Sequence, residues 1–339
     1  MVLLKALQLC ALTPEILRFF AEHQVFTVED FLCHDLHSLS AEADRSLVTP
    51  AFNQAVRAVL SYLEKFQEDW SSGSELVDDS RQFLPIGCAS VDSLLDGGLQ
   101  EGTITELVGA SSTGKSQMCM QAAASVAYWL DATVIYVDTC RTFSGKRVAE
   151  ILESFWDRNQ PKMEEQEDSV GLVMKCIQRI GIFDVFSMLS FLRSLHGSLQ
   201  SKHKIGGDFS HLRLLIIDSA SSVISPVLGA ANSRGHSLMI SMARCLNKLA
   251  MINRIAVLIT NHTVTGDEGQ IKPALGESWI SVPHVRLWLA RDSNSDICEV
   301  SLSKHTSMAC NKQAAFYIGT SGLQSIDESG DPTTPPHPS

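Results

Sequence analysis

The chain has 339 residues, with 38 acidic against 27 basic side chains and a formal net charge of -11. Hydrophobic residues make up 45% and charged residues 19%, which supports a buried core and excludes a wholly disordered chain. No apolar run approaches the roughly 18 residues that a membrane-spanning helix needs, so we expect no membrane segment. The cysteines are scattered and include no C-x-x-C pair, which favours a reducing compartment.

The first part of the chain, residues 1–66, is predicted to be a small helical domain. Thr13 followed by Pro14 is typical of a helix N-cap and first helical position, and Thr27 begins a similar run. Residues 67–82 are polar and lack periodicity, so we predict an interdomain linker there. The alternative is a surface loop inside one domain.

The third region, residues 83–326, alternates between continuously apolar runs and helical stretches. Such runs predict strands of a mostly parallel sheet with helices on both faces. Three further β-like runs follow without intervening helices, so the sheet should end in antiparallel strands. The predicted strands are 103–108, 132–137, 177–183, 212–217, 255–260, 285–290, 297–303 and 314–318, and the predicted helices are 115–130, 145–156, 184–199 and 235–251.

Two segments are predicted to lie outside this α/β pattern. Residues 157–169 are rich in acids, so we expect a solvated surface insertion. The tail, residues 327–339, is rich in proline and is predicted to be disordered.

The most informative motif is a phosphate loop, G-x-x-x-x-G-K-[ST], between an apolar strand and an alanine-rich helix. In such loops the glycines let backbone N–H groups surround the phosphates. Lys115 should reach the β and γ oxygens, and the Ser116 hydroxyl should bind Mg²⁺. The motif predicts a magnesium–nucleotide site formed by Gly109, Ala110, Ser111, Ser112, Thr113, Gly114, Lys115 and Ser116.

A second magnesium ligand is expected at the end of another buried strand. Residues 214–219 form an apolar run that ends in Asp218, which we predict to be the Walker B carboxylate. Asp138 ends a second run of this kind, 134–138, and could equally be a structural cap at a strand end.

The residues around these motifs resemble the ATPase core of RecA-like recombinases. The resemblance covers residues 83 to about 325, and the small helical N-terminal domain fits the same architecture. It implies a RecA-like ATPase that binds ATP with Mg²⁺. The segments that carry the resemblance are 97–99, 102–109, 136–139, 215–219, 259–262, 272–276 and Trp279.

Within this family the chain is most similar to the D-type paralogues of the eukaryotic strand-exchange recombinase. The similarity rests on residues 225–229 and on Thr260-Asn261-His262. It implies homologous-recombination repair of double-strand breaks and stalled forks, in heteromeric complexes with other recombinase paralogues. The N-terminal domain and linker would bind one partner and the ATPase core another. The resemblance also implies binding of single-stranded or branched DNA, assistance to the main recombinase, telomere maintenance, and a nuclear location with some cytoplasmic protein, although no import signal is readable.

Three departures from the recombinase pattern limit what this resemblance implies. Cys140 stands where recombinases have the glutamate that positions the attacking water, and a neutral thiol cannot replace a carboxylate. We therefore expect weak DNA-dependent ATPase activity and assign no catalytic residue. His262 stands where recombinases have a glutamine that senses the γ-phosphate. It could bind phosphate or DNA, or it could have a purely structural role. Residues 67–82 lack the Phe-x-x-Ala peptide by which recombinases dock on the next subunit, so we expect no self-polymerisation through that peptide. Residues 74–78 either add a strand to another partner's sheet or form a flexible tether.

By resemblance, DNA should contact two loops of the core. The first, residues 228–237, offers Arg234 and His236. The second, residues 263–278, offers Lys272 against three acids, so the isolated chain should bind DNA weakly and in a salt-sensitive way.

Several alternatives stay open at this stage. By resemblance Arg147 occupies the position of an adenine-contacting arginine, and the alternative is an exposed helix arginine. The chain could also be a self-assembling ATP-driven recombinase or motor, or a non-hydrolysing adaptor with a structural nucleotide. A RecA-like ATPase outside DNA metabolism is a further possibility.

Overall fold

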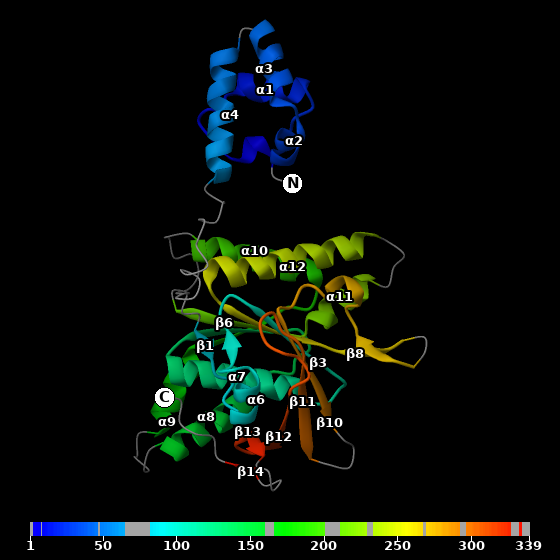
Figure 1. Cartoon of the computed structure of the whole chain (residues 1–339). Coiled ribbons are helices and arrows are strands. Elements are labelled where there is room, and N and C mark those ends of the chain that lie inside the picture. The colour runs from blue at the N-terminus through cyan, green and yellow to red at the C-terminus, as the bar shows by residue number, and fades with distance from the viewer. Residues whose placement is uncertain are drawn as a thin grey trace. The chain divides into compact units, whose positions relative to one another are not determined.

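The computed structural model divides the chain into two units, Met1–Ser80 and Arg81–Ser339 (Figure 1). The predicted linker lies outside the described residues except for Gln82, and so does most of the proline-rich tail. The residues that the structure describes are 3–7, 9–46, 48–64, 82–159, 166–200, 211–228, 233–266, 269–291, 296–326 and 332–333.

Short helices build the first unit, and side-chain caps fix where two of them begin. The Thr13 hydroxyl accepts the N–H of Ile16 at 3.3 Å, and Pro14 is the first residue of its helix, as predicted. Thr27 and Asp30 form a reciprocal capping box at the start of the next helix. Phe19, Phe20, Phe31 and Phe52 pack together in the core of this unit. The elements are η1 (Leu4–Leu7), α1 (Pro14–Glu22), α2 (Val28–Cys33), α3 (Leu36–Arg45) and α4 (Thr49–Glu64).

A large twisted sheet forms the centre of the second unit. Within the described part of the chain its strands follow the order β14-β13-β12-β11-β10-β3-β7-β6-β4-β5. The strands from β10 to β5 are parallel, and those from β10 to β14 are antiparallel, as the sequence predicted. The strands are β3 (Ile104–Gly109), β4 (Thr133–Asp138), β5 (Ile177–Gly181), β6 (Leu212–Asp218), β7 (Ala256–Asn261), β10 (Val285–Arg291), β11 (Ile297–Lys304), β12 (Gln313–Gly319), β13 (Gly322–Ile326) and β14 (Pro332–Thr333).

Helices cover both faces of this sheet (Figure 1). In β4, Val134 and Tyr136 join the core beneath α7 and α8, whereas Ile135 and Val137 join the core beneath α10 and α12. This alternation explains why residues 134–137 are all apolar, because both faces of the strand are buried. The helices are α6 (Ala89–Leu94), α7 (Lys115–Leu130), α8 (Gly145–Asn159), α9 (Gln166–Lys175), α10 (Val185–Gln200), α11 (Ala220–Leu228) and α12 (Ser233–Asn253).

Two small hairpin-like pairs and a short 3-10 turn complete the second unit. Their bounds are β1 (Phe83–Leu84), β2 (Leu99–Gln100), β8 (Thr263–Thr265), β9 (Ile271–Pro273) and η2 (Glu277–Trp279). None of the helices among the described residues has the length and apolar character that a bilayer crossing requires.

The two segments predicted to lie outside the α/β pattern need correction. Helix α8 continues through Asn159 and α9 begins at Gln166, so both ends of the expected insertion are helical, and residues 160–165 lie outside the described part. In the tail, Pro332 pairs with Ile326 of β13, so disorder is the wrong prediction for 332–333. Proline is tolerated there because β14 is an edge strand, where one side needs no N–H donor.

Candidate nucleotide site

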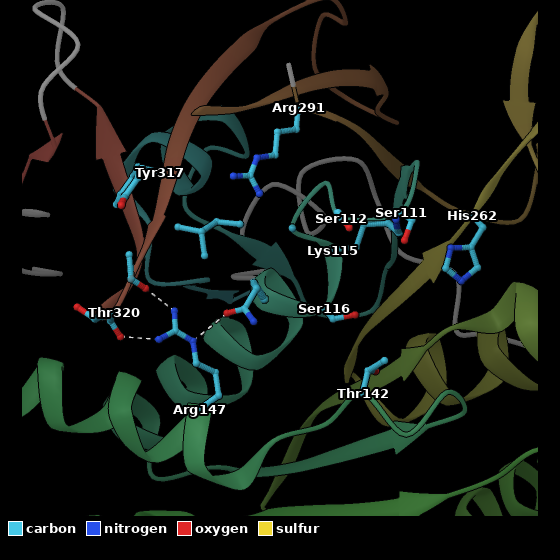
Figure 2. A pocket seen from close by; sticks show the side chains of 14 residues that line it. Ser111, Ser112, Lys115, Ser116, Thr142, Arg147, His262, Arg291, Tyr317 and Thr320 are labelled. Atoms are coloured by element: carbon cyan, nitrogen blue, oxygen red, sulfur yellow. Dashed lines mark hydrogen bonds between the residues drawn. The ribbon is translucent and has the colours of Figure 1, made fainter. Parts of the chain in front are cut away.

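A cavity of about 670 Å³ lies where β3 ends and the phosphate loop begins. Cavities of this size accommodate small ligands and cofactors, and the carboxyl ends of parallel strands are where such sites form. Figure 2 shows the phosphate-loop side chains at its centre, with Arg147 and Tyr317 toward one end and His262 at the other. The cavity therefore combines one local motif with residues from distant parts of the sequence.

The phosphate loop has the backbone geometry that its glycines predict. Gly114 has a φ of 93°, in the left-handed region that favours glycine. A Cβ on Gly109 would lie 2.5 Å from the carbonyl oxygen of Leu289, so only glycine fits beside β10. Gly114 is also the N-cap of α7 and makes no side-chain cap, which leaves the N–H groups of the first turn for an anion.

Lys115 is buried in this loop, with an exposed fraction of 6%. Its ammonium group donates to the carbonyl oxygens of Gly109 at 2.8 Å and Ala110 at 2.6 Å. Burial lowers the pKa of Lys115, and the nearby Asp218 carboxylate opposes that shift. A buried ammonium beside free helix N–H groups matches the charge of a nucleotide's phosphates.

Asp218 lies at the end of β6, and its exposed fraction is 4%. Its Oδ2 accepts the Tyr136 hydroxyl at 2.9 Å and the Thr142 hydroxyl at 3.2 Å, and its Oδ1 accepts the Thr260 hydroxyl at 2.6 Å. Mg²⁺ beside a nucleotide takes one or two protein oxygens and completes its shell with phosphate and water. The Asp218 carboxylate and the Ser116 hydroxyl, which lines the cavity, therefore fit this ion.

Asp138, the carboxylate at the end of β4, is bound by an arginine and by backbone N–H groups. Its Oδ2 pairs with Arg179 at 2.8 Å, and its Oδ1 accepts the N–H groups of Cys140 at 3.3 Å and Thr142 at 3.1 Å. Burial alone would raise the pKa of Asp138, but Arg179 and the two N–H donors outweigh burial and lower it. This geometry is that of a cap on the loop after β4.

Cys140 lies on that loop and has an unexpected chemical state. Its Sγ lies 2.9 Å from the Ser222 hydroxyl oxygen, and a hydrogen bond from His262 is the largest of the causes that lower its pKa to about 6. These partners therefore favour the thiolate form more than in an ordinary cysteine. The prediction of a neutral thiol did not include these partners, because they come from α11 and from the residue that follows β7, far away in the sequence.

Arg147, on α8, is held against the end of β12. Its side chain is 15% exposed, which contradicts the exposed-helix alternative. The guanidinium donates to Gln117 Oε1 at 2.9 Å and to the carbonyl oxygens of Thr320 at 2.5 Å and Gly319 (dashed lines in Figure 2). These acceptors occupy the edge of the planar group, which leaves its faces for stacking on a ring such as adenine.

Two further cavity residues, Arg291 and Tyr317, were not predicted as site residues. They come from the ends of β10 and β12, which the antiparallel part of the sheet brings beside the phosphate loop. No local motif marks either residue. Only the order of the strands could have indicated them.

The predicted DNA-binding residues lie in different places. His262 lines the nucleotide cavity, and its N–H donates to the Ser221 hydroxyl at 3.1 Å. Arg234 and His236 are exposed on the first turns of α12, and Lys272 is exposed on β9. Parts of both predicted loops, residues 229–232 and 267–268, lie outside the described residues.

Comparisons with known proteins agree with this fold and motif. The family model described as Rad51 matches residues 81–168. "DNA repair protein RAD51 homolog 4" of Bos taurus is 34% identical over 84% of this chain and 84% of its own length, and its namesake in Mus musculus is 31% identical over 92% and 93%. A crystal structure of the RadB recombinase superposes with a TM-score of 0.58 at 20% identity, covering 72% of this chain and 100% of that one, and so shows the same fold. The chain therefore belongs to the Rad51 family of RecA-like recombinases, as a paralogue similar to RAD51 homolog 4.

Proposed function

We propose that this chain is an ATP-binding recombinase paralogue that acts in the homologous-recombination repair of DNA. The observation that carries the proposal is the phosphate loop, whose buried Lys115 lines a nucleotide-sized cavity and lies near the Asp218 carboxylate. The relatives of this chain named as DNA repair proteins support the biological setting.

ATP would lie along the cavity in one orientation. Its phosphates would bind the first turn of α7 and Lys115, and its base would stack on the guanidinium of Arg147. Mg²⁺, held by Ser116 and Asp218, would neutralise phosphate charge. Since Cys140 stands in the place of a carboxylate, we propose slow hydrolysis and a main role for ATP in stabilising an interface between subunits.

The partners we propose are other recombinase paralogues and single-stranded or branched DNA. One paralogue would bind the N-terminal unit and linker, and another would bind the ATPase core. Exposed Arg234, His236 and Lys272 would meet DNA phosphates, with His262 as a further candidate. The net charge of -11 opposes DNA binding by the isolated chain, so DNA affinity should depend on the partners and fall steeply with salt. We propose a nuclear location, with some cytoplasmic protein.

The test compares Lys115→Ala with Lys146→Ala, in tagged protein purified from cells together with its partners. Lys146 is a matched control because its side chain is 89% exposed and outside the cavity. Binding of a fluorescent ATP analogue, the mass of the complex and binding of single-stranded DNA are measured in the same samples. We expect Lys115→Ala to lose ATP binding and to weaken the complex, while Lys146→Ala behaves as the wild type.

Three outcomes would contradict parts of this proposal. A complex of unchanged mass with and without ATP would exclude the interface role and favour a structural nucleotide. A homogeneous polymer with brisk DNA-stimulated phosphate release would favour a self-assembling motor. No DNA binding with partners present would exclude the repair role and favour an ATPase outside DNA metabolism.

A further inference from the structure

Three positively charged side chains line the nucleotide cavity, and one of them has no role in the ATP binding proposed above. Lys115 belongs to the phosphate loop and Arg147 to the base end, whereas Arg291 is the last residue of β10. Among the described residues that line the cavity there is no aspartate or glutamate. The cavity is therefore cationic in a chain whose net charge is -11, and it favours a ligand with several negative charges.

The register of the sheet places Arg291 beside the phosphate loop. Leu289 of β10 lies directly opposite Gly109, the residue that ends β3 and begins the loop. Arg291 follows two residues later, so it lies on the same face of the sheet as Leu289 and Leu287. Those two leucines join the core beneath α7, the helix that follows the phosphate loop. Arg291 therefore comes to the face on which α7 begins.

The side chain of Arg291 reaches the cavity from a fixed backbone. Arg291 pairs with Cys298 in the ladder between β10 and β11, and Cys298 is buried. Figure 2 shows the guanidinium extending from the end of β10 toward the middle of the cavity, between Tyr317 and the phosphate-loop residues. A guanidinium presents its N–H donors in a planar fork that matches phosphate oxygens. Position and chemistry therefore suit the binding of phosphate.

Arg291 also has a carboxylate partner at the protein surface. Its Nη2 lies 2.8 Å from Oδ1 of Asp296, and the two side chains are 37% and 77% exposed. Exposed ion pairs contribute little, because water and salt screen both charges. A phosphate chain carries more charge than a carboxylate, and charges inside the cavity are screened less than those at the surface. A phosphate can therefore replace Asp296 as the partner of Arg291.

We propose that Arg291 is a further phosphate-binding residue of the nucleotide site and that Asp296 competes with the phosphates for it. Nucleotide binding exchanges the Asp296 carboxylate for phosphate oxygens as acceptors of the guanidinium. The ligand class is a nucleoside diphosphate or triphosphate, since a cation in the middle of the cavity contributes most to a ligand with a chain of phosphates. This inference rests on the proposed function, and it makes nucleotide affinity depend on a surface carboxylate that does not line the cavity.

The first experiment compares the wild type with Arg291→Gln in the full chain. Adenosine, AMP, ADP and ATP compete with a fluorescent ATP analogue in the presence of Mg²⁺. A hydrogen bond to a charged group corresponds to about a tenfold change in affinity, so Arg291→Gln should weaken ADP and ATP by about tenfold and adenosine by less than about twofold. Equal losses for adenosine and ATP, or no loss for ATP, would overturn the phosphate role.

Asp296→Asn tests the competition, because it should increase the affinity rather than lower it. Loss of the competing carboxylate should raise the affinity for ATP about twofold to fivefold, and the gain should shrink at about 1 M salt, where surface charges are screened. In the Arg291→Gln background Asp296→Asn should have no effect. An absent gain, or a gain that persists without Arg291, would overturn the competition.

Arg45 and Glu42 provide a matched control pair in the N-terminal unit. Their charged atoms lie 2.7 Å apart, and their side chains are 74% and 41% exposed. Arg45→Gln and Glu42→Gln make the same changes in net charge outside the cavity and should leave nucleotide affinity unchanged. Equal effects of these controls would assign the changes to net charge and overturn the role of Arg291. Thermal unfolding checks the fold of every variant, and Arg291→Lys, which keeps the charge but loses the fork, should bind ATP with intermediate affinity.

Inorganic tripolyphosphate separates this inference from the proposed function, because it offers phosphates without a base or a ribose. The wild type should bind tripolyphosphate about tenfold more tightly than Arg291→Gln does. If the wild type fails to bind ATP, the proposed function is contradicted and tripolyphosphate decides on Arg291, since equal or absent binding by the two proteins overturns the phosphate role. Weaker binding of single-stranded DNA by Arg291→Gln, with unchanged ATP affinity, would also overturn it and assign Arg291 to a DNA-binding surface.

Discussion

The ends of β4 and β6 are neighbours in the sheet and look alike in sequence, yet their carboxylates have different surroundings. Asp138 and Asp218 are directly opposite each other in the register of the two strands, and each follows a run of apolar residues. Asp138 is neutralised by Arg179 and accepts backbone N–H groups, whereas Asp218 accepts three hydroxyl groups. A carboxylate that is paired with arginine has its charge neutralised and supports a loop. A carboxylate that accepts uncharged hydroxyl groups beside the cavity keeps its negative charge and can bind a cation.

Thr142 connects the two strand ends. Its N–H donates to Asp138 at 3.1 Å, and its hydroxyl donates to Asp218 at 3.2 Å. The same residue lines the nucleotide cavity. Asp138 therefore holds the loop that places Thr142 beside Asp218. Because Asp138 acts through this loop, it should affect the nucleotide site only indirectly. Substitutions of Asp218, Asp138 and Thr142 therefore separate direct from indirect effects on nucleotide binding.

Asp218→Asn should cause the largest change in nucleotide binding. The amide keeps the size of the side chain but removes the negative charge that Mg²⁺ needs. We expect the affinity for Mg-ATP to fall about 10-fold to 100-fold, with little change when ATP is measured in EDTA. Titration of a fluorescent ATP analogue with and without Mg²⁺ checks this. Equal losses in both conditions would show that Asp218 acts through the fold rather than through the ion.

The ends of β4 and β6 also show how much of the site can be predicted from the sequence. The place and backbone geometry of the phosphate loop follow from the sequence, because they depend on local backbone and on adjacent residues. The sequence predicts Asp218 as the metal-binding carboxylate but leaves the role of Asp138 open, because Arg179 reaches Asp138 from another strand. The partners that lower the pKa of Cys140 also come from distant segments, so the sequence did not indicate them. Apolar runs predicted the central strands well, since burial on both faces makes β3, β6 and β7 continuously apolar over most of their length.

Asp138→Asn should act mainly on stability. The change removes the charge that pairs with Arg179, and we expect the free energy of unfolding to fall by about 1 kcal/mol, since Arg179 is partly exposed and such pairs are screened. The affinity for Mg-ATP should change less than in Asp218→Asn. Urea unfolding of Asp138→Asn, Arg179→Gln and the double variant measures the coupling, and purely additive losses would show that the ion pair contributes nothing.

The pH dependence of the stability difference between wild type and Asp138→Asn is a second readout. The pKa of Asp138 is lowered in the folded chain, so the unfolded chain takes up a proton first as the pH falls. The stability that Asp138 contributes is therefore present above its unfolded pKa and is lost as the pH falls through its folded pKa. The difference between wild type and Asp138→Asn should be constant from pH 8 to about pH 5 and shrink below about pH 4. A difference that grows on acidification would contradict the lowered pKa.

Thr142→Val should have the smallest effect, and it tests the link between the strand ends. Valine keeps the branched shape and the backbone N–H that Asp138 accepts, so the loop should stay in place, and only the hydroxyl bonded to Asp218 is lost. A hydrogen bond to a charged group contributes about 1.5–3 kcal/mol to stability, but Asp218 keeps its hydroxyl donors Tyr136 and Thr260, so we expect the affinity for Mg-ATP to change by about fivefold or less. In the Asp218→Asn background the same substitution should have little further effect, because the carboxylate that orders the ion is already absent. An equal loss in both backgrounds would show that Thr142 meets the nucleotide directly and that the two strand ends are not coupled through it.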